Sequence, residues 1–85
     1  MPTVTVYACS GALCSKNGAP IENAVFVFYT YDGKKAIPNP IHPEQSGNVY
    51  SFGLPYPGAD VNVSAAGHGN STEHMDNFSD YVARI

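Results

Sequence analysis

One segment restricts the fold of this chain more than any other, the run of residues 24–31. After its first residue, every member is β-branched or aromatic, and such residues favour extended strands. Alternate side chains of a strand point to opposite faces of a sheet. If Ala24, Phe26 and Phe28 point into the core, the other face is also apolar. That outer face carries Val25, Val27, Tyr29 and Tyr31.

Four other segments show strand patterns. Polar and apolar residues alternate over residues 3–8 and 61–65, as in strands with one buried face. Residues 49–54 and 81–85 are also rich in β-branched and aromatic side chains. Two of these segments should supply core residues opposite or beside Phe26. These are Tyr50, Phe52 and Leu54 from one segment, and Val61, Val63 and Ala65 from the other.

Turn and loop residues separate the predicted strands. Asp32-Gly33 predicts a tight turn, because glycine supplies the positive φ that hairpins need. Proline cannot donate to a sheet ladder, so three prolines within residues 36–47 predict a long surface loop or a fragmented edge. Residues 9–19 and 67–77 are polar and are predicted to be loops. Short strands between Gly and Pro turns predict an all-β sandwich.

Size and charge limit the function further. The 85 residues suit one domain, residues 1–85, with a thin core and no room for a large ligand cavity. The net charge is −3 with only four basic residues, which argues against nucleic acid and anionic membrane as partners. Charged residues make up 13% of the chain, about half the usual share. This low charge suggests that a partner covers part of the surface.

Three segments, in this order, resemble a known family. Residues 18–27 (GAPIENAVFV) resemble the G-x-P-[IL]-x-x-A-x-V opening of carboxypeptidase regulatory-like, or prealbumin-like, domains. Residues 47–55 (GNVYSFGLP) resemble the G-x-Y-x-F-x-x-L-P segment of that family, with one residue fewer before the leucine. Residues 57–68 (PGADVNVSAAGH) resemble P-G-x-Y-x-V-x-V-S-A-x-G-Y, although Asp60 stands where the family usually carries an aromatic residue.

The resemblance implies a small immunoglobulin-like or prealbumin-like β-sandwich of about seven strands. Members of the family are mostly non-enzymatic accessory, adhesive or structural modules. Residues 67–77 depart from the family pattern, so the arrangement of the last strands does not follow from it. Fold alone does not assign a role, so the function must be argued from the residues.

The apolar outer face of residues 25–31 has two interpretations. In a solvated two-layer sandwich the outer face of a strand is polar, and this one is not. Either the Pro-rich loop or the C-terminal tail folds over it, or it is an exposed patch that packs against another protein subunit. The mixture of tyrosine and β-branched residues is one that interfaces favour.

Two cysteines, Cys9 and Cys14, are separated by four residues. A local disulfide across a loop and a pair of free thiols both fit this spacing. The spacing is not the C-x-x-C of redox proteins, and two thiols are too few for a structural zinc site.

Neither a metal site nor a catalytic site is predicted. Three histidines, His42, His68 and His74, match no zinc or calcium spacing. None of the serines lies in a nucleophile elbow, G-x-S-x-G. We therefore expect no enzyme activity, no metal and no cofactor.

Two features of the sequence suggest a connection with carbohydrate. Three N-x-[ST] sequons, at Asn62, Asn70 and Asn77, are candidate glycosylation sites if the chain reaches a glycosylating compartment. Three tyrosines, Tyr29, Tyr31 and Tyr56, are candidates for an aromatic platform that binds carbohydrate.

These observations predict a non-enzymatic structural subunit that acts through protein–protein packing. The N-terminus, residues 1–4, has no basic leader and no apolar signal core, and no stretch approaches the length of a membrane helix. We expect the chain on the surface of a virion, as a capsid decoration or tail protein, or in an extracellular filament. The alternative is a cell-surface adhesive or carbohydrate-binding module.

Overall fold

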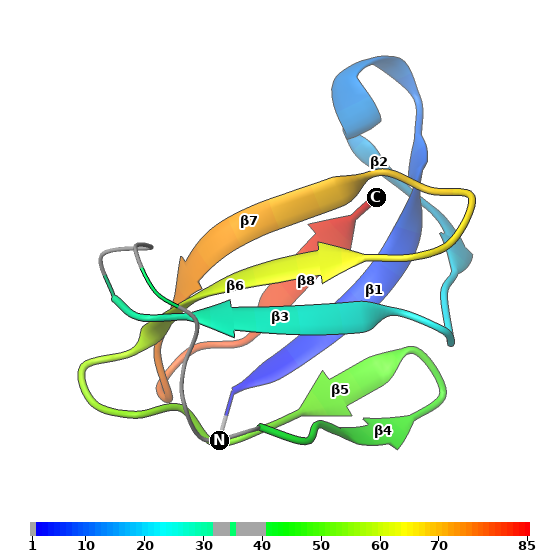
Figure 1. The fold of residues 1–85 in the computed structure, drawn as a ribbon. Helices are drawn as coiled ribbons and strands as arrows, with labels where there is room; N and C mark the ends of the chain where they lie inside the picture. The colour runs from blue at the N-terminus through cyan, green and yellow to red at the C-terminus, as the bar shows by residue number, and fades with distance from the viewer. Residues whose placement is uncertain (1, 32–34, 36–40) are drawn as a thin grey trace.

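The chain forms two β-sheets that face each other across a shared hydrophobic core (Figure 1). This computed structural model describes residues 2–31, 35 and 41–85. Within them lie eight strands and one 3-10 turn, with no α-helix. These elements are β1 (Thr3–Ser10), η1 (Ala12–Cys14), β2 (Lys16–Pro20), β3 (Val25–Tyr29), β4 (Glu44–Ser46), β5 (Val49–Ser51), β6 (Ala59–Ser64), β7 (Asn70–Met75) and β8 (Tyr81–Arg84). The predicted all-β sandwich is confirmed.

The first sheet is built around β1, which has three partners. β5 pairs antiparallel with the first half of β1, β2 pairs antiparallel with its second half, and β8 runs parallel to it. The Val6 N–H donates to the Asn48 carbonyl and the Val6 carbonyl accepts from the Ile21 N–H, so β5 and β2 share one edge of β1. β8 lies on the other edge, where the Ile85 N–H donates to the Tyr7 carbonyl. β4 extends the sheet beyond β5.

The second sheet contains three antiparallel strands in the order β3-β6-β7. β6 is central: Tyr29 of β3 lies opposite Asp60, and Asp60 lies opposite His74 of β7. β3 and β7 therefore form the two edges of this sheet, and Figure 1 shows β6 between them.

The core lies between the sheets and takes alternate residues from each long strand. Val4 and Val6 of β1 are fully buried, as are Val61 and Met75 of the facing sheet, each at 1% exposure or less. Aromatic rings meet across the interior, with ring centroids 4.8 Å apart for Phe26 and Tyr50. The predicted inward residues are buried or packed against the core: Ala24, Phe26, Phe28, Tyr50, Phe52, Leu54, Val61, Val63 and Ala65.

The structure has eight strands rather than about seven, and three of them occupy segments that were predicted to be loops or a fragmented edge. β2 and β4 are almost wholly exposed, and β7 buries only Met75. Because these strands hide so little apolar surface, they lack the alternation that marks a strand in the sequence. Their extended shape comes from hydrogen-bonded pairing with β1, β5 and β6. The predicted turn at Asp32-Gly33 and much of the proline-rich segment lie outside the described residues.

No helix long and apolar enough to cross a membrane occurs in the part of the chain that the structure describes.

Candidate functional site

The outer face of β3 is apolar and open to solvent. Val25 and Tyr31 are each 56% exposed and Val27 is 38% exposed, whereas Tyr29 is half-buried. These side chains point outward because Phe26 and Phe28, between them, point into the core. We call this set the β3 face: Val25, Val27, Tyr29 and Tyr31. The predicted outward direction of these four residues agrees with the structure.

The rest of the same sheet surface is polar. The residues beside the β3 face on β6 are Ser64, Asn62 and Asp60, and those on β7 are Asn70, Thr72 and His74. They bond to one another, since the Asn62 amide donates to the Asn70 side-chain oxygen at 3.3 Å and to the Thr72 hydroxyl at 2.8 Å. Among the described residues of this surface, the apolar side chains therefore lie on β3 and just after its end.

The C-terminal tail does not cover the β3 face. It forms β8, which pairs with β1 in the other sheet, on the far side of the core. Of the other predicted cover, the proline-rich segment 36–47, residues 36–40 lie outside the described residues. Its described part forms β4, which pairs with β5 in the other sheet.

The open edge of β3 is the second feature of the site. Among the described residues only β6 pairs with β3. The Ala24 N–H, just before the strand, donates to the Tyr50 hydroxyl at 3.1 Å. The Thr30 N–H, just after it, donates to the Lys35 carbonyl at 2.7 Å. Neither group bonds to β6, so we infer from alternation along the strand that the main-chain groups of Phe26 and Phe28 lie on this same open edge.

A small hollow adjoins this edge between the two sheets. It measures about 150 Å³ and is lined by Ala24, Phe26, Pro43, Gln45 and Tyr50. This volume is well below the roughly 300–1,000 Å³ of a small-molecule site, so the hollow is too small to hold a drug-sized ligand.

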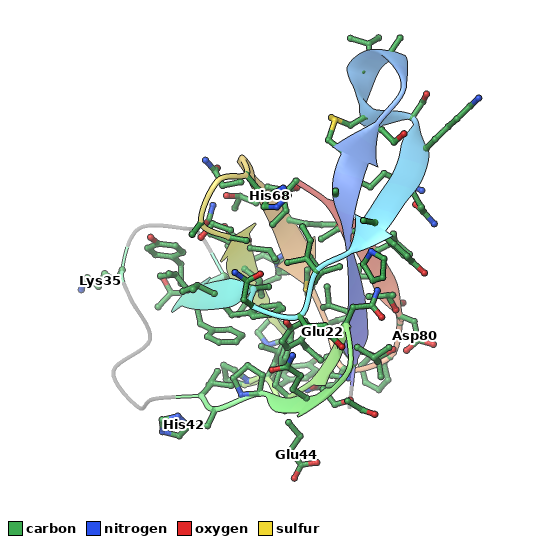
Figure 2. All side chains as sticks on the ribbon, turned by 90° about the vertical axis from the view of Figure 1, so that its right-hand side faces the viewer. Glu22, Lys35, His42, Glu44, His68 and Asp80 are labelled. Carbon is green, nitrogen blue, oxygen red and sulfur yellow. A yellow bond between two sulfur atoms is a disulfide. The ribbon has the colours of Figure 1, made fainter. Side chains whose placement is uncertain are left out.

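Of the three histidines considered as possible metal ligands, His74 is the one whose ring lies within hydrogen-bonding distance of a carboxylate. Its Nδ1 lies 3.0 Å from Oδ1 of Asp60, and the Tyr31 ring stands edge-on to it with centroids 4.1 Å apart. His74 lies on β7, whereas His42 and His68 lie in two separate loops, far from each other (Figure 2). No group of three metal-ligating side chains exists among the residues described.

Cys9 and Cys14 form a disulfide at the tip of the β1–β2 hairpin. The tip extends beyond both sheets, and Figure 2 shows the sulfur bond near its end. Between the cysteines, Leu13 is fully exposed and has a left-handed φ of 57°, which costs a non-glycine residue about 1–2 kcal/mol. Leu13 lies in a segment predicted to be a polar loop, and its exposed apolar surface was not predicted.

The three sequons lie in different environments. Asn70 is exposed at the first position of β7, whereas Asn62 is half-buried in its side-chain ladder. The Asn77 amide is occupied, since its oxygen accepts from the Leu54 N–H at 2.9 Å and its nitrogen donates to the Leu54 carbonyl at 2.8 Å. Of the three amide groups, that of Asn70 is the most open to a modifying enzyme.

The three candidate platform tyrosines also differ in their surroundings. Tyr56 is 89% exposed in the turn before β6, while Tyr29 is half-buried on β3. The Tyr31 ring packs edge-on against the imidazole of His74. The three tyrosines thus lie in three different surroundings.

Comparisons of the chain with protein-family models, with curated proteins and with solved structures found no match.

Proposed function

We propose that this protein is a non-enzymatic structural subunit that packs against other protein subunits through the β3 face. The observation that carries the proposal is the exposure of Val25 and Val27 on an edge strand, with Tyr31 exposed just after the strand ends. Full burial of a side chain such as valine stabilises a protein by about 1.5–3 kcal/mol. A partner that covers the β3 face gains this free energy, which the isolated chain does not.

The open edge supports the same proposal. Natural sheets usually protect an edge strand with charges, prolines or a covering loop, because unpaired main-chain groups recruit other strands. β3 contains neither a charge nor a proline over its whole length, Val25–Tyr29. An edge that is apolar, and that no described residue protects, is suited to a permanent neighbour.

The disulfide is relevant to the location of such an assembly. Disulfides persist in oxidising surroundings and are rare in the reducing cytosol. Cys9–Cys14 therefore supports the proposed setting on the surface of a virion or in an extracellular filament. The resemblance to carboxypeptidase regulatory-like domains, mostly accessory, adhesive or structural modules, supports a non-enzymatic role.

A pair of matched valine substitutions tests the proposal. Val27→Lys places a charge in the centre of the β3 face, where an interface would bury it without a partner at a cost of several kcal/mol. Val82→Lys is the control, because Val82 is a similarly exposed valine, at 45%, on the other sheet. Light scattering of concentrated protein should show that Val27→Lys reduces the assembled fraction at least about tenfold while Val82→Lys leaves it unchanged.

Circular dichroism should show that both variants keep the fold. A chain that stays monomeric at every concentration, binds glycans in that state and is insensitive to Val27→Lys would contradict the proposal and favour a carbohydrate-binding module.

A further inference from the structure

We infer that the partner of β3 is β3 of a second copy of this chain. The two strands run antiparallel about a two-fold axis at Val27 and join two three-stranded sheets into one of six strands. This inference rests on the proposed function, since it names the partner of the same strand. The two copies meet along the open edge of β3, and the side chains of the β3 face pack against their equivalents across that edge. The available main-chain groups, the order of side chains along β3 and the charges at its ends support it.

The main-chain groups fit this register. Those of Phe26 and Phe28 lie on the edge with which no described strand pairs, while the N–H groups of Ala24 and Thr30 are already bonded within the chain. With Val27 on the axis, Phe26 of one copy lies opposite Phe28 of the other, and this pair exchanges both of its hydrogen bonds. The two equivalent pairs make four hydrogen bonds, and the occupied groups at each end of the strand limit the ladder to this length.

The side chains of β3 are self-complementary. A two-fold interface brings the same surface of both copies together, so a strand that pairs with itself must match its own reversed order. The order Val, Phe, Val, Phe, Tyr of β3 is nearly the same in both directions. On the outer face, Val27 then meets Val27 and Val25 meets Tyr29, and pairs of β-branched and aromatic residues stabilise neighbouring strands.

The charges at the ends of β3 are also complementary. Glu22 precedes the strand and Lys35 lies beside its end, through the bond from Thr30, and both are exposed. Figure 2 shows the two side chains well apart in one chain. In an antiparallel pair the acidic end of one β3 lies at the basic end of the other, so opposite charges approach at both ends. No like charges stand opposite each other along the strand itself, because β3 is uncharged.

Cysteine trapping tests the register directly. Val27 on the axis forms a pair without hydrogen bonds, whose Cα atoms are about 4.5 Å apart, within the range that a disulfide spans. Val27→Cys should therefore cross-link to itself under mild oxidation and give a species of twice the 9.0 kDa chain mass. Val25→Cys is the matched control, because Val25 faces Tyr29 of the other copy. The two Val25 residues lie on opposite sides of the axis, each two residues from it, so they are about four residues apart along the paired strands.

Intact-mass and peptide analysis should show at least about tenfold more cross-linked dimer for Val27→Cys than for Val25→Cys, with Cys9–Cys14 unchanged in both. Circular dichroism and light scattering on the reduced variants check that the fold and the assembly are kept. If the protein assembles and Val27→Lys disrupts the assembly, but Val27→Cys cross-links no better than Val25→Cys, the two-fold pairing is wrong and the proposed function stands. If the protein neither assembles nor responds to Val27→Lys, both are wrong.

Discussion

At the residue scale, the outward direction of the β3 face follows from alternation alone. Once Phe26 and Phe28 are assigned to the core, Val25 and Val27 must point away from it. This part of the candidate site could be predicted because each residue's direction is fixed by its neighbours in the strand. Whether another segment covers the face could not be predicted, since that depends on where distant strands pair.

Asn77 shows the opposite case, a residue whose role is invisible in the sequence. Its motif marks it as a candidate for glycosylation, yet in the structure its amide bonds both main-chain groups of buried Leu54. The motif depends on three adjacent residues, whereas the contact joins positions 23 apart.

Asn77→Ala should therefore destabilise the fold. The substitution leaves the Leu54 N–H and carbonyl unpaired, which costs about 1–3 kcal/mol. Urea unfolding of the variant should show this loss, and exposed Asn70→Ala should change the free energy of unfolding by less than about 0.5 kcal/mol. If the two variants unfold at the same urea concentration, the two hydrogen bonds between Asn77 and Leu54 do not stabilise the protein.

At the scale of elements, strands with one buried face could be predicted and strands without one could not. Residues 3–8 and 61–65 alternate because every second residue enters the core, and both appear as strands. β7 has the sequence NSTEHM, in which only Met75 is buried, so its polar residues resemble a loop. The strand exists because its main chain pairs with β6 along six residues.

The turn that leads into β6 depends on a glycine. Gly58 has a φ of 141°, and a Cβ there would collide with the carbonyl oxygen of Met75 and approach the His74 ring to 3.3 Å. Met75 lies on β7, opposite Ala59, so the glycine lets the start of β6 approach its partner strand.

Gly58→Ala should consequently destabilise the protein by about 2 kcal/mol or more. For a domain of this size such a loss lowers the Tm by about 10 °C, which a thermal melt resolves. Gly53→Ala is the matched control, because no described heavy atom lies within 4 Å of its added Cβ. The steric account is wrong if both variants melt within a few degrees of the unmodified protein.

At the scale of the whole molecule, the surface is uneven. Charged residues are scarce at 13%, and the second sheet combines a polar half on β6 and β7 with an apolar edge on β3. The disulfide-linked tip with Leu13 extends at a distance from that edge. A two-fold pairing through β3 would cover the apolar edge of both copies and leave both tips free.

The most direct measurement of the central claim is residue-resolved amide exchange of the unmodified protein in dilute and in concentrated solution. The Phe26 and Phe28 N–H groups lie on the edge with which no strand of the described chain pairs, so they should exchange rapidly when the chain is alone. Concentration should slow their exchange at least about tenfold, because pairing with another strand protects amides that a single chain leaves open. Amides of β8, including Val82, should not respond. Exchange at Phe26 and Phe28 that does not change with concentration, or protection that appears at β8 instead, would contradict the assignment of β3 as the subunit interface.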